Sequence, residues 1–257
     1  MGPRSIAILP ARLGSTRLAR KVLLAETGLP LFVHTARNAA RCKDLQRVVV
    51  ATDSEEVLVA AREHGVEACL TRSDHQSGTD RVREALDSLG GDWDVVLNVQ
   101  ADEPDLSPED LATLIGAFED PLCEAATLSL SIEDEADWQR SSVVKIVLDQ
   151  SGSALYFSRA PIPSRVHARI PAQGPFGLRH IGVYAYRPEA LRRFCDLPQG
   201  RLEAMENLEQ LRWLEHGHAM RVLPASWVPR GIDTPEDYAD FVARHRTGSQ
   251  HHDRNAT

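Results

Sequence analysis

Four cationic side chains are crowded into a short segment near the N-terminus. The stretch SIAILPARLGSTRLARKVLL, residues 5–24, carries Arg12, Arg17, Arg20 and Lys21 around a Gly-Ser pair. A loop that follows a strand can turn backbone N–H groups toward a phosphate, and glycine lets the backbone come close. Arginine grips phosphate oxygens bidentately, and lysine supplies a point charge. The segment therefore predicts a phosphate-binding loop, with a solvated basic turn as the alternative. It matches neither the dinucleotide-binding fingerprint nor the P-loop.

Two later segments contain carboxylates at positions that could bind a metal ion. NVQADEP, residues 98–104, places Gln100 and Asp102 after an apolar run, and RGIDTPEDY places Asp233 before a helix start. Carboxylates at two strand ends could share a hard divalent ion with a triphosphate. For Asp233 a simple helix cap is the alternative. Asp102, beside a cationic loop, is harder to explain by structure alone.

A polar segment between these two regions could contact a nucleobase. TRSDHQSGTDR, residues 71–81, contains Arg72, Ser77 and Gly78. A Ser-Gly-Thr turn can bring backbone donors and acceptors to the edge of a base. The alternative, equally weighted, is that Ser77 and its neighbours cap the next helix.

The elements that must position these residues alternate between strand and helix in the first half of the chain. Apolar runs over 6–9, 47–51 and 95–99 are typical of buried parallel strands. Between and after them, DSEEVLVAAREHG predicts a helix with a capping box of Asp53 and Glu56, stopped by Gly65. SPEDLATLIGAF predicts another, with Ser107 as N-cap and Pro108 at the first helical position. This order predicts an α/β fold with a doubly wound sheet, in which ligands lie beyond the carboxyl ends of the strands.

The second half predicts an antiparallel extension of the same sheet. Its expected strands cover residues 127–132, 143–148, 155–157 and 179–186. LEAMENLEQLRWLEHG, residues 202–217, is interpreted as one helix with Met205, Leu208, Leu211 and Leu214 on one side. We expect a single domain over residues 1–246, followed by a polar, disordered tail over 247–257.

Composition excludes several classes of protein. The chain has 257 residues, a formal net charge of −8 and 42% hydrophobic residues, and its apolar runs are short. The acidic balance argues against a general nucleic-acid or membrane-surface binder, and we expect a cytoplasmic protein. Four scattered cysteines without metal-ligand spacing predict reduced thiols and no structural metal.

Taken together, these motifs resemble the 3-deoxy-manno-octulosonate cytidylyltransferases, also called CMP-Kdo synthetases. The resemblance covers nearly the whole chain and runs in family order: PAR with STRL and Lys21, ATD, DHQSGTDR, NVQ with DEP, ALYFSRAPIP, RHIGVYAYR, LEQLR and GIDTPED. It implies a single α/β domain around a mixed, mainly parallel sheet of the nucleotide-diphospho-sugar transferase type. It also implies a homodimer and a requirement for Mg²⁺.

The resemblance further implies a reaction and a site. CTP and the acidic keto-sugar 3-deoxy-manno-octulosonate (Kdo) would give CMP-Kdo and pyrophosphate, which activates Kdo for lipopolysaccharide synthesis. By resemblance, the catalytic residues would be Arg12, Lys21 and Asp102, and the magnesium ligands Asp102 and Asp233. The CTP-binding residues would be Arg12, Arg17, Lys21, Arg72, Ser77, Gly78 and Gln100. Arg159 would meet the sugar carboxylate, and the other sugar-binding residues would be Gln100, His180, Tyr184, Glu209 and Gln210.

The chain departs from the family pattern at three places near these residues. Ala101 replaces a usual glycine, Ala19 and Arg20 replace Pro-Gly before the lysine, and Val22 replaces a proline after it. A methyl group at position 101 would cost about 1 kcal/mol if that residue needed positive φ. Two alternatives stay open: the same chemistry on 8-amino-Kdo or a sialic acid, and a non-catalytic nucleotide- or sugar-binding homologue.

Overall fold

One mixed sheet forms the centre of the molecule. The computed structural model of the chain describes residues 2–14, 18–167 and 174–246, and within them nine strands join into one sheet. The strands are β1 (Ser5–Ala11), β2 (Arg47–Thr52), β3 (Ala68–Leu70), β4 (Val95–Asn98), β5 (Ala125–Ile132), β6 (Lys145–Leu148), β7 (Ala154–Ser158), β8 (Gly177–Tyr186) and β9 (Arg221–Pro224). The main order is β3-β2-β1-β4-β8-β5-β9, and β6 links the β6–β7 pair to β8. The tail over 247–257 and Arg17 lie outside the described residues.

Strand direction changes at β8, as the second half of the sequence predicts. β3, β2, β1 and β4 are parallel neighbours, and β9 is parallel to β5. β8 runs antiparallel to β4, β5 and β6, and β7 runs antiparallel to β6. The expectation of a mixed, mainly parallel sheet with an antiparallel extension is therefore confirmed. Because β1 and β4 are parallel neighbours, the segments that follow Ala11 and Asn98 emerge at the same edge.

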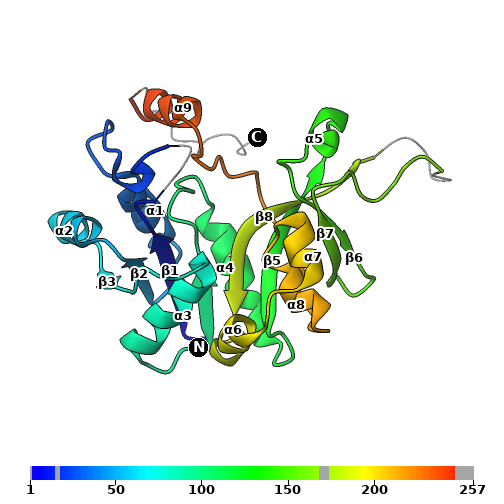
Figure 1. Cartoon of the computed structure of the whole chain (residues 1–257), viewed down its shortest axis with the longest axis horizontal. Coiled ribbons are helices and arrows are strands. Elements are labelled where there is room, and N and C mark those ends of the chain that lie inside the picture. Colours follow the sequence, from blue (N-terminus) through cyan, green and yellow to red (C-terminus); the bar gives the residue numbers. More distant parts are fainter. Residues whose placement is uncertain (1, 15–17, 168–173, 247–257) are drawn as a thin grey trace.

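Helices cover both faces of the sheet (Figure 1). Ala7 and Leu9 of β1 pack into one core with α1 and α4, while Ile6 and Ile8 pack into the other with α3, α6 and α8. This alternation is the period of two expected of a strand buried on both faces. The helices are α1 (Leu31–Ala39), α2 (Glu55–Glu63), α3 (Gly78–Leu89), α4 (Pro108–Gly116), α5 (Glu135–Gln139), α6 (Pro188–Asp196), α7 (Arg201–Glu206), α8 (Leu211–Glu215) and α9 (Pro235–Arg246), with 3₁₀ turns η1 (Lys21–Leu23) and η2 (Ala117–Glu119). Among the described residues, none of these helices is long and apolar enough to cross a membrane.

Helix starts agree with the sequence except at α2. Ser107 caps α4 and Pro108 opens it, as predicted. At α2, however, the N-cap is Ser54, whose hydroxyl accepts from Val57 N, so the predicted capping box on Asp53 is wrong. The Asp53 carboxylate instead pairs with Arg81 of α3 at 2.9 Å. Asp53, which the local sequence pattern predicts as the helix cap, thus forms a tertiary ion pair.

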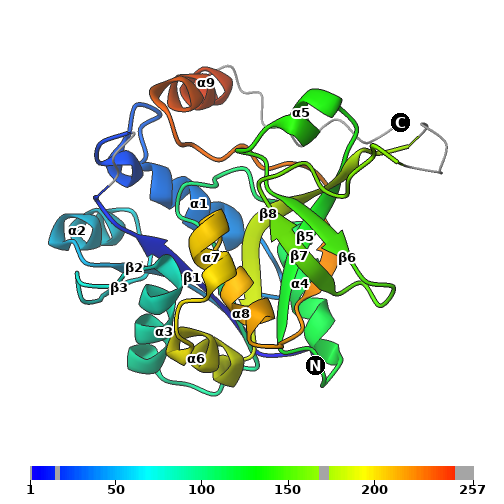
Figure 2. The ribbon, with the colours of Figure 1, turned by 45° about the vertical axis from the view of Figure 1, so that its right-hand side comes forward.

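The predicted long helix over 202–217 is also wrong, because the chain breaks it into α7 and α8. Asn207 adopts a left-handed conformation with φ 52°, which ends α7. The break turns Met205 to solvent, 71% exposed, while Leu208 and Leu211 are buried in the core. Both short helices lie on the same side of the sheet as α6 (Figure 2). The break therefore places residues 207–210 in a turn rather than on a helix face.

The last helix packs over the loop that follows β1. Residues of α9 form a small apolar cluster with that region: Leu31, Ile232, Tyr238, Phe241 and Val242. The hydroxyl of Tyr238 also accepts a hydrogen bond from Glu26 N at 2.9 Å. Figure 1 shows α9 lying beyond the sheet edge, above the segment between β1 and α1. This packing holds the segment before α9, which contains Asp233, close to the cationic loop.

Candidate active site

Lys21 is the point at which three distant segments meet. It opens η1 and is largely buried, with 11% of its side chain exposed. Its Nζ donates a hydrogen bond to Oδ2 of Asp102 and another, of 2.9 Å, to Oδ1 of Asp233. The structure therefore brings together three of the residues singled out in the sequence, from positions 21, 102 and 233.

Asp102 is held by its backbone as well as by Lys21. It lies in the turn after β4, and its carbonyl accepts from Ile232 N at 3.0 Å. The preceding carbonyl, of Ala101, accepts from the hydroxyl of Thr35 at 2.9 Å. Ala101 is buried and does not adopt a positive φ, so the strain considered for a methyl group at this position is not present.

The helix cap predicted as the alternative role of Asp233 is formed by its neighbour Thr234. The hydroxyl of Thr234 accepts from Asp237 N at 3.2 Å, and Asp237 Oδ2 accepts from the N–H groups of Asp233 and Thr234. These bonds form a capping box on Thr234. The Asp233 carboxylate meanwhile pairs with Lys21, which favours a role at the site.

A further carboxyl group, Glu103, belongs to this charged cluster. Burial raises its pKa to about 8, with Asp102 and Asp233 adding to the rise and Lys21 opposing it. Its Oε2 is buried and has no hydrogen-bond partner among the described residues. For Lys21, burial lowers the pKa, but the two aspartates outweigh that effect and raise it above its ordinary value. The ammonium group is thus kept charged between two carboxylates.

A second group of residues forms a hydrogen-bonded chain across the sheet edge. Gln100 Nε2 donates to Asn98 Oδ1 at 3.4 Å, and Asn98 Nδ2 donates to the hydroxyl of Thr79 at 3.3 Å. Thr79 in turn donates to Glu209 Oε2 at 2.8 Å. The chain joins two predicted sugar-binding residues, Gln100 and Glu209, through two that the sequence did not single out. Glu209 lies half-buried in the turn between α7 and α8, not on a surface helix face.

Ser77 and Gly78 open α3, so the capping interpretation of this segment is confirmed. The Ser77 hydroxyl accepts from Asp80 N at 3.1 Å. At Gly78 an added Cβ would lie 3.3 Å from Pro10 Cγ, a tight approach that favours glycine. Contact of these residues with a nucleobase stays a prediction, and it is compatible with the cap.

His180 and Tyr184 lie side by side on β8. Their ring centroids are 5.4 Å apart, and His180 also meets Phe157 of β7 edge-on at 5.0 Å. Burial lowers the pKa of His180 to about 3, so the ring is neutral. Burial raises the pKa of Tyr184 well above its ordinary value, and the charges of Glu209 and Glu103 add to it. Tyr184 lies opposite Asn98 of β4, the strand that leads into the turn with Asp102.

The other predicted site residues have no described contact with Lys21, Asp102 or Asp233. Arg12 follows β1 and is exposed. Arg72 is exposed and pairs with Asp74 at 3.1 Å. Gln210 is buried at the start of α8. Arg159 directs its guanidinium to backbone carbonyls at the end of α7. No described contact joins Arg12 or Arg72 to the Lys21 cluster.

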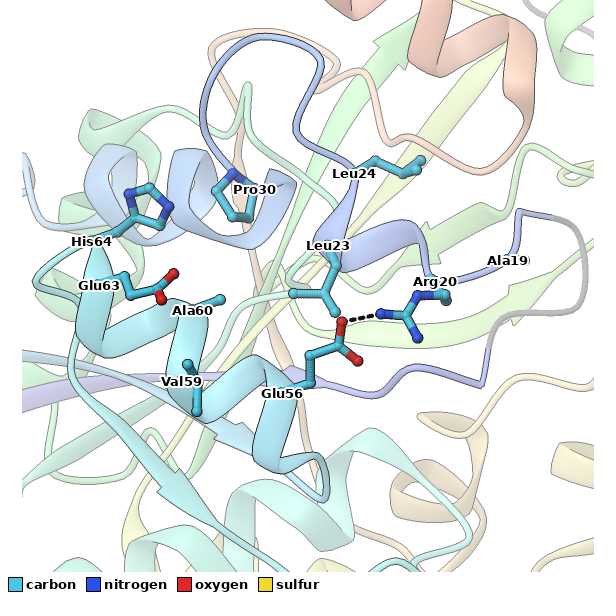
Figure 3. A pocket seen from close by; sticks show the side chains of 10 residues that line it. All are labelled: Ala19, Arg20, Leu23, Leu24, Pro30, Glu56, Val59, Ala60, Glu63 and His64. Atoms are coloured by element: carbon cyan, nitrogen blue, oxygen red, sulfur yellow. Dashed lines mark hydrogen bonds and ion pairs between the residues drawn. The ribbon is translucent and has the colours of Figure 1, made fainter.

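The residue before Lys21 holds the loop from the other side. Arg20 has a left-handed conformation, with φ 54°, and its guanidinium pairs with the carboxylate of Glu56 on α2. Figure 3 shows this ion pair beside a pocket of about 400 Å³ between η1 and α2. Glycine adopts this left-handed conformation without strain, which explains why the family usually has glycine at this position. Of the three departures from the family pattern, the replacement of that glycine by Arg20 is therefore the one that strains the backbone.

Sequence reasoning assigned no role to Glu103, Asn98, Thr79 or Glu206. For Glu103 and Asn98 a signal was present, because both lie in the polar stretch after β4 beside Asp102. Thr79 was considered only as part of the Ser-Gly-Thr turn, which was interpreted either as a nucleobase contact or as a helix start. Glu206 follows no motif of its own, and its contacts depend on the break at Asn207.

The sheet order and the lysine–carboxylate cluster at the strand ends define a nucleotidyltransferase type of protein, and comparisons with known proteins agree. Residues 6–221 match the family described as cytidylyltransferase. A 3-deoxy-manno-octulosonate cytidylyltransferase of Anaeromyxobacter sp. (strain Fw109-5) is 45% identical, over 91% of this chain and 93% of the relative. One of Syntrophobacter fumaroxidans (strain DSM 10017 / MPOB) is 44% identical, over 93% of this chain and 96% of the relative.

A solved structure gives the same answer. The CTP complex of CMP:2-keto-3-deoxy-manno-octonic acid synthetase superposes with a TM-score of 0.88 at 36% identity, over 95% of this chain and 99% of that one. The chain belongs to the 3-deoxy-manno-octulosonate cytidylyltransferase family.

Two serine caps allow the two roles of Ser77 to be separated. Ser77→Ala and Ser107→Ala each remove a comparable N-cap and should each lower the free energy of unfolding by about 1 kcal/mol. Only Ser77→Ala should also weaken CTP binding severalfold, measured by calorimetry on the folded variants. Equal CTP affinity in both would leave Ser77 as a cap alone.

The strain at Arg20 predicts an unusual order of stabilities in urea unfolding. Arg20→Gly should be more stable than Arg20→Ala by roughly 0.5–1 kcal/mol, because alanine keeps the left-handed strain. Glu56→Gln removes the same exposed ion pair without touching φ and should lose no more than about 1 kcal/mol. Finding Arg20→Ala the more stable of the first two would contradict strain at this residue.

Proposed function

We propose that the protein transfers the CMP group of CTP to Kdo, giving CMP-Kdo and pyrophosphate. The observation that carries the proposal is the meeting of Lys21, Asp102 and Asp233 at the edge where β1 and β4 end. In the reaction, the anomeric hydroxyl of the sugar forms a new bond to the α-phosphorus, and the bond to pyrophosphate breaks. The product is Kdo in the activated form used for lipopolysaccharide synthesis.

The chain's own cations would serve the phosphates. Negative charge grows on the transferring and leaving oxygens, and preorganised positive groups stabilise it. Lys21 lies between two carboxylates and stays charged, so a cation is present at the site before the substrates bind. Arg12, exposed after β1, and Arg17 are proposed to hold the triphosphate beside it. Both remain predictions from the resemblance.

The carboxylates fit the magnesium ion that the family implies. Asp102 and Asp233 both contact the Lys21 ammonium and so lie beside each other, and oxygen donors are what a hard divalent cation prefers. Among the described residues, no three acidic, His or Cys side chains are arranged to hold an ion alone. The two aspartates would therefore hold Mg²⁺ together with triphosphate oxygens. When bound, the ion would offset phosphate charge.

The sugar is proposed to lie near β8 and the turn after α7. Tyr184 and Glu209 can exchange hydrogen bonds with hydroxyls, and Gln100 is linked to Glu209 through Asn98 and Thr79. His180 is neutral and its Nε2 lies 3.0 Å from the hydroxyl of Thr127, and its contact with the sugar is proposed from the resemblance. The homodimer and the cytoplasmic location stay predictions from the sequence, as does the absence of nucleic-acid and membrane partners.

Pyrophosphate release tests the function. With CTP and Mg²⁺, the protein should release pyrophosphate with Kdo, and less or none with 8-amino-Kdo or N-acetylneuraminate in parallel. Asp102→Asn should cut turnover by two or more orders of magnitude, because it removes a charged ligand from the proposed Mg²⁺ site and the ion-pair partner that positions Lys21. Asp105→Asn, in the same loop but paired with Arg244 at 2.7 Å, is the matched control and should stay active.

The outcomes of this experiment separate the alternatives. A preference for another sugar would keep the chemistry and change the substrate. No release with any sugar, from folded protein that binds CTP, would favour a non-catalytic binding role. A near-normal rate for Asp102→Asn would contradict the proposed site.

Asp233 is tested by a magnesium titration of the turnover rate. Asp233→Asn should shift the half-saturating Mg²⁺ concentration upward by about tenfold, because one of two proposed ligands loses its charge. Glu236→Gln removes an exposed charge from the first turn of α9 and is the control. If both variants titrate like the parent protein, Asp233 is not a metal ligand.

A further inference from the structure

Glu206, at the end of α7, ties that helix to the end of β7. Its carboxylate accepts a hydrogen bond from the hydroxyl of Ser158 at 2.6 Å and, on its other oxygen, from the N–H of Arg159 at 2.9 Å. The hydroxyl of Tyr156 lies 3.4 Å from the first oxygen. Both carboxylate oxygens are therefore occupied by donors from one strand end.

The connection is reciprocal, because Arg159 binds back to the helix. Its Nε donates to the carbonyl of Glu206 at 2.8 Å, and its Nη2 to the carbonyl of Asn207 at 3.3 Å. These carbonyls belong to the last turn of α7, where the helix leaves acceptors without internal partners. Arg159 thus caps the C-terminus of α7 while Glu206 holds the backbone of Arg159.

A buried lysine also binds the end of β7. Lys145 of β6 is fully buried, and its Nζ donates to three carbonyls, of Arg140, Val143 and Arg159, at 2.6–2.9 Å. The backbone of Arg159 is therefore fixed at its N–H by Glu206 and at its carbonyl by Lys145. A strand end held at both polar groups is a rigid base for the helix that it caps.

The turn that follows Glu206 carries two of the proposed sugar-binding residues. Asn207 turns the chain through its left-handed conformation, and Glu209 and Gln210 come directly after Leu208. Thr79 holds Glu209 at one side. On the other side, the Glu206–Arg159 connection joins this turn by hydrogen bonds to the end of β7, where Leu208 of the turn also shares a core with Phe157.

We propose that Glu206 is a positioning residue that sets the place of Glu209 and Gln210 at the sugar end of the active site. This inference rests on the proposed function. Glu206 acts through the turn and does not itself touch the substrates.

Glutamine at this position disturbs the connection without changing its size. Its amide has one acceptor oxygen, whereas Ser158 and Arg159 bind to two different carboxylate oxygens. With its oxygen on the N–H of Arg159, the amide would direct its NH₂ at the Ser158 hydroxyl, which must turn from donor to acceptor, and both bonds would lose the strength that the carboxylate charge gives them. The left-handed turn would then be held less firmly.

Steady-state kinetics with each substrate varied in turn tests the proposal. In Glu206→Gln the KM for Kdo should rise roughly tenfold or more, with the KM for CTP unchanged within twofold. Ser158→Ala removes one donor to the same carboxylate and should raise the KM for Kdo by a smaller factor. It also serves as the second variant should Glu206→Gln fail to fold. Glu124→Gln, which loses a carboxylate bound to Arg193 far along the chain, should change neither KM.

The results distinguish this inference from the proposed function. If the parent protein releases no pyrophosphate with Kdo, the proposed function fails before any variant is made. If the parent is active but Glu206→Gln and Ser158→Ala keep its KM for Kdo, Glu206 has no positioning role. An equal rise in both KM values would equally overturn it, because that pattern indicates general destabilisation. A rise for Kdo alone supports it.

Discussion

The ion-paired ammonium of Lys21 is the interaction on which the active site depends. Asp102 and Asp233 would repel each other if no cation lay between them, and burial, together with these two charges, raises the pKa of the neighbouring Glu103 to about 8. Lys21 offsets that repulsion and joins the loop after β1, the turn after β4 and the segment before α9. A triphosphate and a divalent ion would enter a site whose charges are already arranged. Preorganisation of this kind is what phosphoryl-group transfer chiefly requires of a protein.

The sheet makes this meeting possible. Parallel pairing of β1 with β4 brings their carboxyl ends to one edge, and antiparallel β8 beside β4 places Tyr184 opposite Asn98. The nucleotide side and the proposed sugar side of the site are therefore neighbours on adjacent strands. α9 completes the arrangement from the far end of the chain, since its apolar cluster packs on Leu31 and brings Asp233 to the loop. Two ends of the chain thus close one site.

The sugar side is built by a different device. There the chain interrupts a helix at Asn207 and fixes the interruption with the Glu206–Arg159 connection, so that polar residues lie in a turn. Arg159 donates hydrogen bonds to backbone carbonyls at the end of α7 and at Ser141, and its contact with a sugar carboxylate stays a prediction from the resemblance. The loop before Lys21 is fixed in a similar way, because Arg20 has a left-handed backbone and its side chain pairs with Glu56. In both places backbone conformation, rather than side-chain type, decides where the functional groups lie.

Local pattern by itself determined most strands of the sheet, though not β9, and the start of α4, because alternation and capping are properties of neighbouring residues. The motifs in order also identified the family. Only the tertiary structure decided the rest. Asp53 left its predicted cap because Arg81 binds it, and the helix over 202–217 broke because Arg159 and the buried core compensate for a left-handed Asn207. Likewise, Asp233 was indistinguishable from a helix cap until Lys21, 212 residues away, was found beside it. Interactions between residues so far apart in sequence leave no periodic signal, and so only the folded chain could reveal them.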